Sequence, residues 1–343
     1  MNIGILTGGG DCPGLNAAIR AVTRRSIDSY GSKVIGIHNG WAGLINGETE
    51  PLSLYAVSGI LHRGGTILGT SRTNPMKNGE DVARIKENIK KFELDAVVAI
   101  GGEDTLGAAA QLNEQGLPMV GLPKTIDNDI VGTEYTFGFD TAVSIATDAI
   151  DRLHTTAESH HRVMVIEVMG RHTGWIALNA GTAGGADCIL IPEDPVEMSY
   201  ICDLVKGRKQ RGKTFSLVVV AEGFVPHDAD KFVVQDEQLD EFGHVRLGGI
   251  GHLIGAQIEN LTGIETRVTI LGHIQRGGSP TPYDRVLATR YGVAAADLIH
   301  KGEFGRMVAL QASRIESIPL SDIVGKIRNV DLDLYETAKV FFG

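Results

Sequence analysis

The sequence predicts an α/β protein of two doubly wound lobes, each a mainly parallel sheet flanked by helices. Short apolar segments alternate with helical patterns along the chain, as they do where helices connect parallel strands. The chain has 343 residues, more than one hydrophobic core usually holds, so two lobes are expected. The alternation starts again near Thr141, which indicates where the second lobe begins.

The first lobe is expected to comprise residues 1–138 and 275–325. Its helical segments carry apolar residues three or four positions apart, and its strands are short apolar runs. The expected strands are Asn2–Thr7, Lys33–Ile37, Ala96–Ile100, Leu117–Leu122 and Met307–Leu310. The expected helices are Ala17–Tyr30, Asp81–Phe92, Thr105–Gln115, with Gly116 as its C-cap, and Tyr283–His300.

The second lobe is expected to comprise residues 139–274 and 326–343. The expected helices are Thr141–Glu158, Trp175–Ala180, Val196–Arg211 and Gly251–Leu261. The expected strands are Arg162–Val168, Asp187–Ile191, Phe215–Val220 and Thr266–Leu271. The polar residues 227–249 are expected to form a surface excursion. The two sheets are expected to face each other, with the active site in the cleft between the lobes.

Charge and composition argue against several classes of function. The formal net charge of −10 disfavours non-specific binding to nucleic acid, which needs a basic surface. The three cysteines are too few and too scattered for a disulfide framework or a CxxC metal site. The N-terminus lacks a basic segment of the signal-peptide type, and no apolar run reaches membrane-spanning length. We therefore expect a cytoplasmic protein without a nucleic-acid or membrane partner.

Two glycine-rich loops follow strands of the first lobe. In Gly8-Gly9-Gly10-Asp11, the backbone N–H groups can approach a phosphate closely at the start of a helix, although a generic turn is the alternative. Cys12 in this loop is a reactive thiol or, more simply, a small filler. Gly101-Gly102-Glu103-Asp104 suits a hard cation that bridges phosphate oxygens. Asp104 or Thr105 also fits the N-cap of the following helix.

A third loop, Pro123-Lys124-Thr125-Ile126-Asp127-Asn128-Asp129, follows a buried strand. Open α/β sheets bind ligands at the carboxyl ends of their strands, where this loop lies. Asp127 is placed to take a proton from an attacking hydroxyl group, and Lys124 to hold a phosphate. The alternative interpretation is a turn rich in Asp and Asn.

Four arginines mark strand ends or loops of the second lobe and are expected to converge on one cleft: Arg162, Arg171, Arg267 and Arg276. A guanidinium group makes bidentate contacts with phosphate, although a single surface arginine more often forms a salt bridge. Glu222 and His273 occupy similar places and suit sugar hydroxyls. The residues thus indicate phosphoryl transfer from a metal-bound donor to a phosphorylated polyol, with Asp127 as the base.

The sequence closely resembles the 6-phosphofructokinase family. The matching segments run in the family's order over nearly the whole chain: Thr7–Arg20, Pro123–Asp129, Glu167–Arg171, Ile191–Glu193, Ala221–Gly223 and Leu271–Pro280. The resemblance implies a first lobe that binds the phosphoryl donor, a second lobe that binds fructose 6-phosphate, and Mg²⁺ as cofactor.

The resemblance also implies roles for single residues. Asp127 would be the base for the sugar 1-hydroxyl, with Thr125 beside it and Arg171, Lys124 and Asp104 also in the catalytic set. The sugar phosphate would be held by Thr125, Asp127, Arg162, Met169, Gly170, Arg171, Glu222, Arg267, His273 and Arg276. The donor phosphates would face Gly9, Gly10, Arg72, Asp104 and Lys124. Glu103 stands at the metal-binding position, which is usually Asp in the family. In the family, arginines matching Arg162 and Arg267 come from a neighbouring subunit, which implies a homodimer or homotetramer.

Asp104 and Lys124 bear on the phosphoryl donor. ATP-using members of the family typically carry Gly at both positions, whereas this pair is typical of the diphosphate-dependent branch. Asp104 would stand where the α-phosphate of ATP must pass. Two like charges about 4 Å apart cost about 4 kcal/mol at an effective dielectric near 20. That cost corresponds to a roughly thousandfold preference against ATP. A salt bridge between Asp104 and Lys124 is the alternative, and it predicts no donor preference.

The expected activity is therefore reversible, Mg²⁺-dependent transfer from diphosphate to fructose 6-phosphate, giving fructose 1,6-bisphosphate and phosphate. The alternatives are an ATP-dependent 6-phosphofructokinase, the same chemistry on sedoheptulose 7-phosphate, and a catalytically silent sensor of phosphorylated metabolites. Many allosteric bacterial members carry Arg-Leu-Arg where this chain has Arg152-Leu153-His154. This departure predicts weak or absent regulation by ADP or phosphoenolpyruvate.

Overall fold

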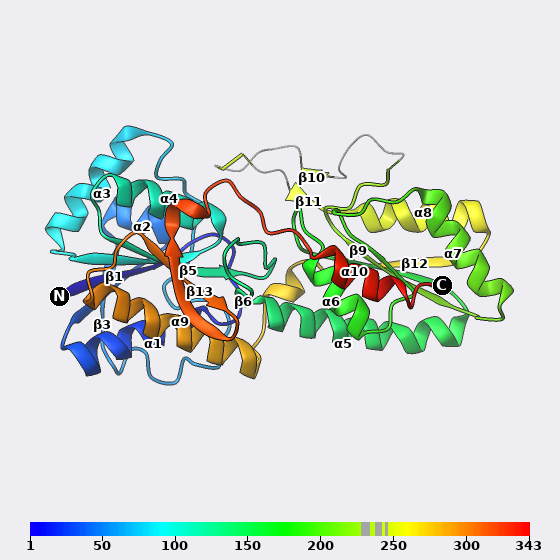
Figure 1. The fold of residues 1–343 in the computed structure, drawn as a ribbon, viewed down its shortest axis with the longest axis horizontal. Coiled ribbons are helices and arrows are strands. Elements are labelled where there is room, and N and C mark those ends of the chain that lie inside the picture. The colour runs from blue at the N-terminus through cyan, green and yellow to red at the C-terminus, as the bar shows by residue number, and fades with distance from the viewer. Residues whose placement is uncertain (228–233, 237–241, 244–245) are drawn as a thin grey trace. The chain divides into compact units, whose positions relative to one another are not determined.

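The structure is a computed structural model that describes residues 1–227, 234–236, 242–243 and 246–343. The chain divides into two compact units, shown with their helices and strands in Figure 1. Unit 1 consists chiefly of Met1–Thr141 and Arg276–Ile327, and unit 2 of Ala142–Leu239, Val245–Gln275 and Arg328–Gly343. Each unit contains a largely or wholly parallel sheet covered by helices, which confirms the predicted fold class.

The sheet of unit 1 has the strand order β14-β13-β5-β4-β1-β2-β3, with β6 paired to β5. These strands are β1 Asn2–Thr7, β2 Lys33–Ile37, β3 Thr49–Leu52, β4 Ala96–Gly101, β5 Met119–Thr125, β6 Phe137–Gly138, β13 Arg306–Gln311 and β14 Arg314–Pro319. The pairs β2–β3 and β13–β14 are antiparallel and the others are parallel. The sequence does not predict β3, β6 and β14, because these strands are short or only half-buried and lack a continuous apolar run.

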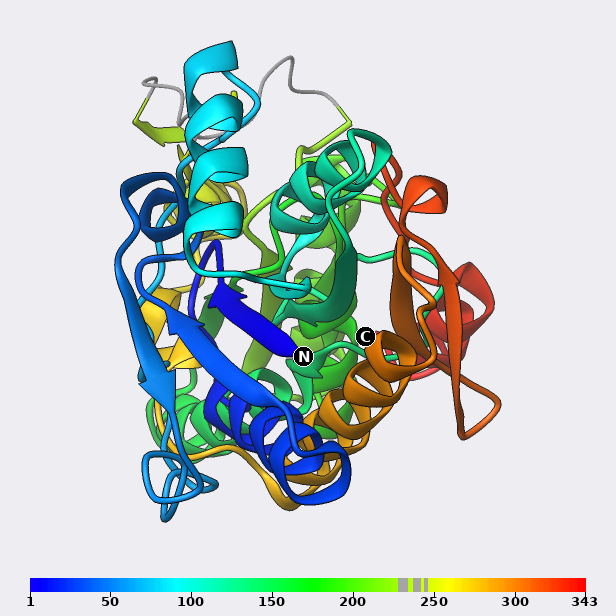
Figure 2. The same cartoon turned by 90° about the vertical axis from the view of Figure 1, so that its left-hand side faces the viewer.

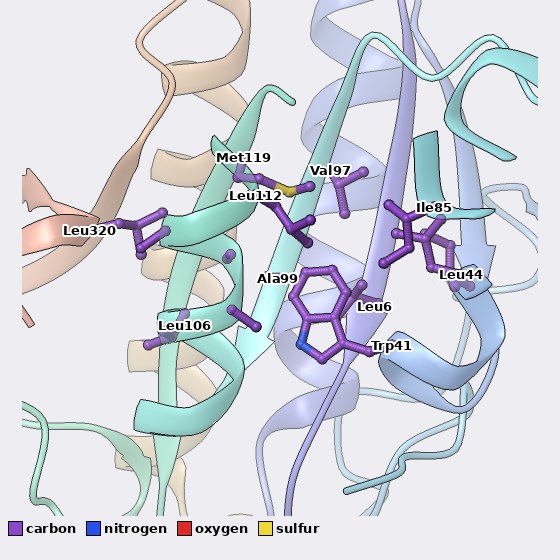
Figure 3. Close-up of a cluster of buried hydrophobic side chains, with 14 of the residues drawn as sticks. Leu6, Trp41, Leu44, Ile85, Val97, Ala99, Leu106, Leu112, Met119 and Leu320 are labelled. Carbon is purple, nitrogen blue, oxygen red and sulfur yellow. The ribbon is translucent and has the colours of Figure 1, made fainter. Parts of the chain in front are cut away.

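Helices cover both faces of this sheet. They are α1 Leu15–Arg24, extended by a π-helical turn at Arg25–Ser29, α2 Gly40–Asn46, α3 Gly79–Lys91, α4 Glu103–Glu114 and α9 Pro282–His300. Helices α1 and α9 pack together on one face, and α2, α3 and α4 lie on the other (Figures 1 and 2). Between α2, α4 and the sheet, the fully buried Trp41 ring lies beside Leu6 and Ala99 (Figure 3).

The sheet of unit 2 has the order β12-β7-β9-β8, and all its strands are parallel. They are β7 Val163–Val168, β8 Cys188–Leu190, β9 Ser216–Ala221 and β12 Thr266–Ile270. The helices are α5 Phe139–His160, which begins in unit 1, α6 Trp175–Ala183, α7 Met198–Gln210, α8 Ile250–Thr262 and α10 Leu332–Lys339. The apolar residues of α7 and α8 form one core with β7, β8 and β9. Most of the predicted excursion at 227–249 lies outside the described residues, which include the short strands β10 Val234–Asp236 and β11 Arg246–Leu247.

Two element boundaries differ from the prediction in ways that concern the site. Helix α4 begins at Glu103, with Gly102 rather than Asp104 or Thr105 as its N-cap. The two carboxylates therefore lie in the first helical turn, where the helix dipole favours negative charge. Strand β5 does not end at Leu122 but continues through Pro123, Lys124 and Thr125. These three residues are therefore positioned by the sheet rather than by a free loop.

Among the described residues, every helix is too short or too polar to qualify as a membrane-spanning segment.

Candidate active site

The carboxyl ends of β1, β4 and β5 bring the three polar loops of unit 1 to one edge of the sheet. These strands are neighbours in the order β5-β4-β1, and their registers pair Thr7 with Ile100 and Gly101 with Pro123. From β1 the chain first forms β2 and β3 on one side and then β4 and β5 on the other. Such a switch in strand order leaves a crevice at the carboxyl ends, where doubly wound folds bind ligands.

Close packing around Thr105 explains two of the glycines at this edge. A Cβ atom added to Gly8 would lie 2.6 Å from Thr105 Oγ1, and one added to Gly101 would lie 2.3 Å from Thr105 Cβ. Both positions therefore exclude any larger side chain. As a result, the first turn of α4, with Glu103 and Asp104, packs directly against the glycine loop.

The segment before Arg72 is tied to the same glycine loop. The backbone N–H of Gly9 donates to the Ser71 carbonyl over 3.0 Å, and Thr70 Oγ1 donates to the Gly9 carbonyl over 2.6 Å. Gly9 has φ of +76°, a conformation that glycine adopts readily. These bonds bring the exposed Arg72 next to the loop that was predicted to hold donor phosphates.

Lys124 is a buried cation at the centre of this edge. Its side chain is 3% exposed, and Nζ donates a hydrogen bond of 2.5 Å to the Gly10 carbonyl. Burial lowers the pKa of Lys124 and the charge of Arg276 lowers it too, whereas the carboxylates of Asp127 and Asp11 raise it. The ammonium group thus lies against the glycine loop with carboxylates nearby.

Local hydrogen bonds fix the Asp127 loop. Thr125 Oγ1 accepts from the Asp127 backbone N–H over 3.1 Å and donates to Asp127 Oδ2 over 3.3 Å. Asn128 adopts φ of 55°, which Asn tolerates better than most residues, and its Oδ1 accepts from the Thr136 N–H over 3.0 Å. Thr136 Oγ1 in turn donates to the Thr125 carbonyl over 2.7 Å. These hydrogen bonds form the predicted turn and orient the Asp127 carboxylate, so the turn and the site interpretations are compatible.

Glu103 and Asp104 are both half-buried in the first turn of α4. Glu103 Oε1 accepts from the Gly325 N–H over 3.1 Å, which leaves its other oxygen for a further ligand. No group of three or more metal-ligating side chains occurs within the described residues. A cation beside Glu103 would therefore take most of its ligands from the substrate and from water, which is the usual mode of Mg²⁺.

Arg276 lies in unit 1, whereas Arg162, Arg171 and Arg267 lie in unit 2. A Cβ atom added to Gly10 would lie 2.3 Å from Arg276 Nη1, so the guanidinium group occupies the space beside Gly10. Arg276 and Lys124 therefore bring two positive charges to the glycine loop. Cys12 is fully buried there, and burial raises the pKa of its thiol to about 12. This supports the filler interpretation over a reactive thiol.

The carboxyl ends of β7 and β9 form the corresponding edge of unit 2. Glu222 Oε1 accepts from the backbone N–H groups of Gly170 (3.3 Å) and Arg171 (3.0 Å). A Cβ atom added to Gly223 would lie 2.0 Å from the Arg171 carbonyl oxygen, so the two loops approach as closely as backbones allow. Met169 is buried below them, and the exposed His273 lies beyond the neighbouring strand β12 in a short 3₁₀ helix, Gly272–Arg276. This edge thus gathers Met169, Gly170, Arg171 and Glu222.

Arg162 and Arg267 do not join this edge. Arg162 precedes β7, and Arg267 is the second residue of β12, so both lie at the amino end of the sheet. At about 3.3 Å per residue, β7 separates the Cα atoms of Arg162 and Met169 by about 23 Å. Both guanidinium groups pair with the Glu265 carboxylate, in the case of Arg162 over 2.8 Å. The expectation that four arginines converge is therefore wrong within a single chain.

Several residues that support the site were not predicted. Glu167 is 2% exposed, and its carboxylate accepts from the N–H groups of Gly249 (2.9 Å) and Gly251 (2.8 Å) at the start of α8. Glu193 accepts from Gly174 and Val330, which fastens the segment before α10. Each pair is far apart in sequence, so no local pattern reveals the partner. Glu167 and Glu193 did stand in family-like segments, which was the available signal.

These features define a doubly wound α/β enzyme whose glycine loops and buried charges lie at strand ends. The phosphofructokinase family model matches residues 2–299. A Streptomyces coelicolor protein named "Pyrophosphate--fructose 6-phosphate 1-phosphotransferase" is 56% identical over 100% of both chains. A Corynebacterium efficiens protein named "ATP-dependent 6-phosphofructokinase" is 50% identical over 100% of this chain and 99% of its own. The Pichia pastoris phosphofructokinase crystal structure has a TM-score of 0.85 at 31% identity, covering 99% of this chain and 36% of that one.

The chain belongs to the phosphofructokinase family, as the resemblance of its motifs predicted. It is thus an enzyme of this family, whereas its relatives differ in the phosphoryl donor that their names state.

Proposed function

We propose that this enzyme transfers a phosphoryl group from diphosphate to the 1-hydroxyl of fructose 6-phosphate, reversibly and with Mg²⁺. The observation that carries the donor assignment is Lys124. It is buried, its ammonium group touches the Gly10 carbonyl, and Asp104 stands in the adjoining first turn of α4. The high identity to relatives named for diphosphate supports the same donor.

The charge on Asp104 disfavours ATP at this edge. Carboxylate and α-phosphate repel one another, and the pair would cost about 4 kcal/mol at 4 Å and an effective dielectric near 20. Asp104 is half-exposed, and solvent lowers that value toward the 1 kcal/mol expected in water. The expected discrimination against ATP is therefore between about fivefold and about a thousandfold. Diphosphate has no α-phosphate to meet this charge.

The residues present fit Mg²⁺ at Glu103. A half-buried carboxylate with one oxygen bonded to a backbone N–H suits a cation that keeps phosphate and water ligands. When bound, the cation neutralises charge on the phosphate oxygens. Lys124 and the N–H groups of the glycine loop supply the protein's own positive potential for the transferred group.

Asp127 is assigned as the general base. Asp127 is 5% exposed, and Thr125 Oγ1 accepts from its backbone N–H and donates to its carboxylate. The base takes the proton of the sugar 1-hydroxyl as the new O–P bond forms, and the P–O bond of diphosphate breaks to release phosphate. Thr125 therefore fixes the carboxylate, which leaves the chemistry to Asp127.

The sugar phosphate is assigned to the edge of unit 2. Met169, Gly170, Arg171, Glu222 and His273 lie on loops that follow β7, β9 and β12. The Glu222 carboxylate holds the backbone of Gly170 and Arg171, so it shapes this site as well as offering an acceptor to hydroxyl groups. Arg171 and Arg276 supply guanidinium groups for phosphate.

A second copy of the chain is assigned to complete the site. Arg162 and Arg267 lie at the opposite end of the sheet from Arg171 and are fixed to Glu265, so they do not serve the site of their own subunit. In the family, arginines at these positions enter a neighbouring site. We therefore assign the active form as a homodimer or homotetramer.

An ATP-dependent activity is the second candidate, and one observation favours it. Relatives from Corynebacterium efficiens and Mycobacterium tuberculosis are named ATP-dependent although they are 50–51% identical to this chain. The same chemistry on sedoheptulose 7-phosphate requires only a longer sugar. A silent sensor would need neither Asp127 nor Glu103.

The donor assignment is tested by exchanging the pair. The variant Asp104→Gly with Lys124→Gly should lose most turnover with diphosphate and gain turnover with ATP. Asp104→Asn keeps the size of the side chain and removes its charge, so it distinguishes electrostatic repulsion of ATP from steric exclusion of ATP. Glu114→Gly removes the same charge at the exposed carboxyl end of the same helix and serves as the control. A double variant that prefers diphosphate as strongly as the parent would refute the assignment.

A further inference from the structure

The amino ends of two helices, α5 and α9, meet beside the Asp127 loop. Asp284, in the first turn of α9, accepts from the Thr141 backbone N–H (2.8 Å) and from Thr141 Oγ1 (2.5 Å) in the first turn of α5. In return, Thr141 Oγ1 accepts from the Thr281 N–H over 3.0 Å. Thr281, the N-cap of α9, also donates to Asp140 Oδ2 over 2.6 Å. Each helix therefore caps the other.

The charges of this junction favour a fixed geometry. The amino end of a helix carries partial positive charge, so two such ends repel unless anions lie between them. Asp140 and Asp284 supply those anions from α5 and α9. Asp284 is 0% exposed, and burial raises its pKa to about 6 although the Thr141 hydroxyl and the amides of Gly138 and Thr141 lower it.

The junction continues into the proposed catalytic residues. Strand β6 immediately precedes α5 and pairs with the end of β5, with Phe137 opposite Lys124 and Gly138 opposite Thr125. Thr136, just before β6, holds the Thr125 carbonyl and the Asn128 side chain. Thr141, the partner of Asp284, therefore follows Gly138, the partner of Thr125, by three positions.

We propose that Asp284 is a positioning residue for phosphoryl transfer, which fixes β6 and through it Lys124 and Thr125. The inference rests on the proposed roles of those two residues. Asp284 does not touch the reacting groups; it holds Thr141 at the start of α5, which directly follows β6, and β6 transmits that position to the strand end. The site thus depends on a carboxylate of helix α9 that follows Thr125 of strand β5 by 159 positions.

The competing interpretation is that the junction contributes stability alone. Under that interpretation, loss of a buried hydrogen bond here has the same effect as loss of one elsewhere. Tyr335 provides the matched comparison, because it is 1% exposed and its hydroxyl donates to the Ile189 carbonyl over 2.8 Å in unit 2. Tyr335→Phe removes one buried hydrogen bond and leaves the junction intact.

The test compares Asp284→Asn, Thr141→Val and Thr141→Ser with Tyr335→Phe in the full-length enzyme. Displacement of reacting groups by about 1 Å can cost a hundredfold, so Thr141→Val and Asp284→Asn should lower kcat by about tenfold to a hundredfold. KM for fructose 6-phosphate should change much less than kcat, because most of the proposed sugar-binding residues lie at the edge of unit 2, which these variants leave untouched. Thr141→Ser restores the hydroxyl group and should restore kcat.

Hydrogen exchange provides a second measurement that does not need turnover. Amides 124–128 and 137–141 should exchange faster in Thr141→Val and Asp284→Asn than in the parent. Their exchange rates in Tyr335→Phe should equal those of the parent. Parent-like kcat in both junction variants, an equal loss of kcat in Tyr335→Phe, or unchanged exchange at 124–128 would each overturn the proposal. If the parent enzyme turns over with ATP and not with diphosphate, the donor assignment is refuted. The test of Asp284 still holds in that case, because kcat of the parent and of the variants is then measured with ATP as the donor.

Discussion

The raised pKa of Asp284 predicts a specific dependence of stability on pH. Its folded-state pKa is about 6, against 3.8 for the ordinary carboxyl group, and burial is the main cause. Between these two values the folded chain binds more protons than the unfolded chain. Stability from this group is therefore fully present below about pH 4 and is lost as pH rises through 6. The titratable groups nearby are Asp140 on α5, the buried Cys12 and Tyr283 on α9, and the thiol and the phenol stay neutral over this pH range because burial raises their pKa values to about 12.

The size of the effect follows from the two pKa values. They differ by about 2, and each unit corresponds to about 1.36 kcal/mol, so the charged group costs about 3 kcal/mol at neutral pH. Asp284→Asn removes the titration. Its free energy of unfolding, relative to the parent, should rise by about 3 kcal/mol between pH 4 and pH 8.

Urea unfolding of parent and variant at fixed protein concentration, repeated from pH 4 to pH 8, measures this difference. Tyr335→Phe is the control, because the burial of Tyr335 raises its pKa far above this range, so its difference from the parent should be constant. A difference between Asp284→Asn and the parent that is flat, or that falls as pH rises, would show that the carboxylate is not destabilised by burial. That result would remove the electrostatic account of the junction.

Three further predictions concern catalysis and regulation. Asp127→Asn should lower kcat by about 10²–10⁴-fold and leave calorimetric binding of fructose 6-phosphate nearly unchanged, whereas normal turnover would exclude Asp127 as the base. Arg162→Ala and Asp127→Asn enzymes, each inactive alone, should regain about a quarter of parent activity after their subunits are dissociated and mixed as dimers; no recovery would mean that Arg162 serves its own subunit. His154 stands where many allosteric members carry arginine, and its ring packs edge-on against the Phe215 ring with 4.9 Å between the ring centroids. ADP or phosphoenolpyruvate at micromolar concentration should therefore not shift the fructose 6-phosphate saturation curve. A clear shift would contradict the inference from Arg152-Leu153-His154.

Local sequence patterns predicted much of the fold. Strands such as Asn2–Thr7 and Ala96–Gly101 are buried along their whole length or nearly so, and their apolar runs identify them directly. The glycine loops were found because a strand that ends in glycine and acid residues is a strong local signal. The start of α4 was misplaced by two residues, since Glu103 and Asp104 suit a loop and a first helical turn equally well.

Local patterns of this kind do not predict contacts between residues that are far apart in the sequence. Arg276 lies against Gly10 and Asp284 against Thr141, and these pairs are formed by packing between distant segments. The position of Arg162 at the opposite end of the sheet from Arg171, in contrast, could have been predicted from the sequence. Arg162 stands at the start of a predicted strand and Arg171 follows its end, and a parallel sheet separates those positions by the length of the strand.

The choice of phosphoryl donor is the central claim, and one coupled assay tests it most directly. Purified enzyme is given fructose 6-phosphate and Mg²⁺, with diphosphate in one reaction and ATP in the other. The account predicts that kcat/KM for diphosphate exceeds that for ATP by at least about fivefold, the lower bound set by Asp104. Equal or greater efficiency with ATP would contradict it and show that Asp104 and Lys124 are compatible with a nucleotide.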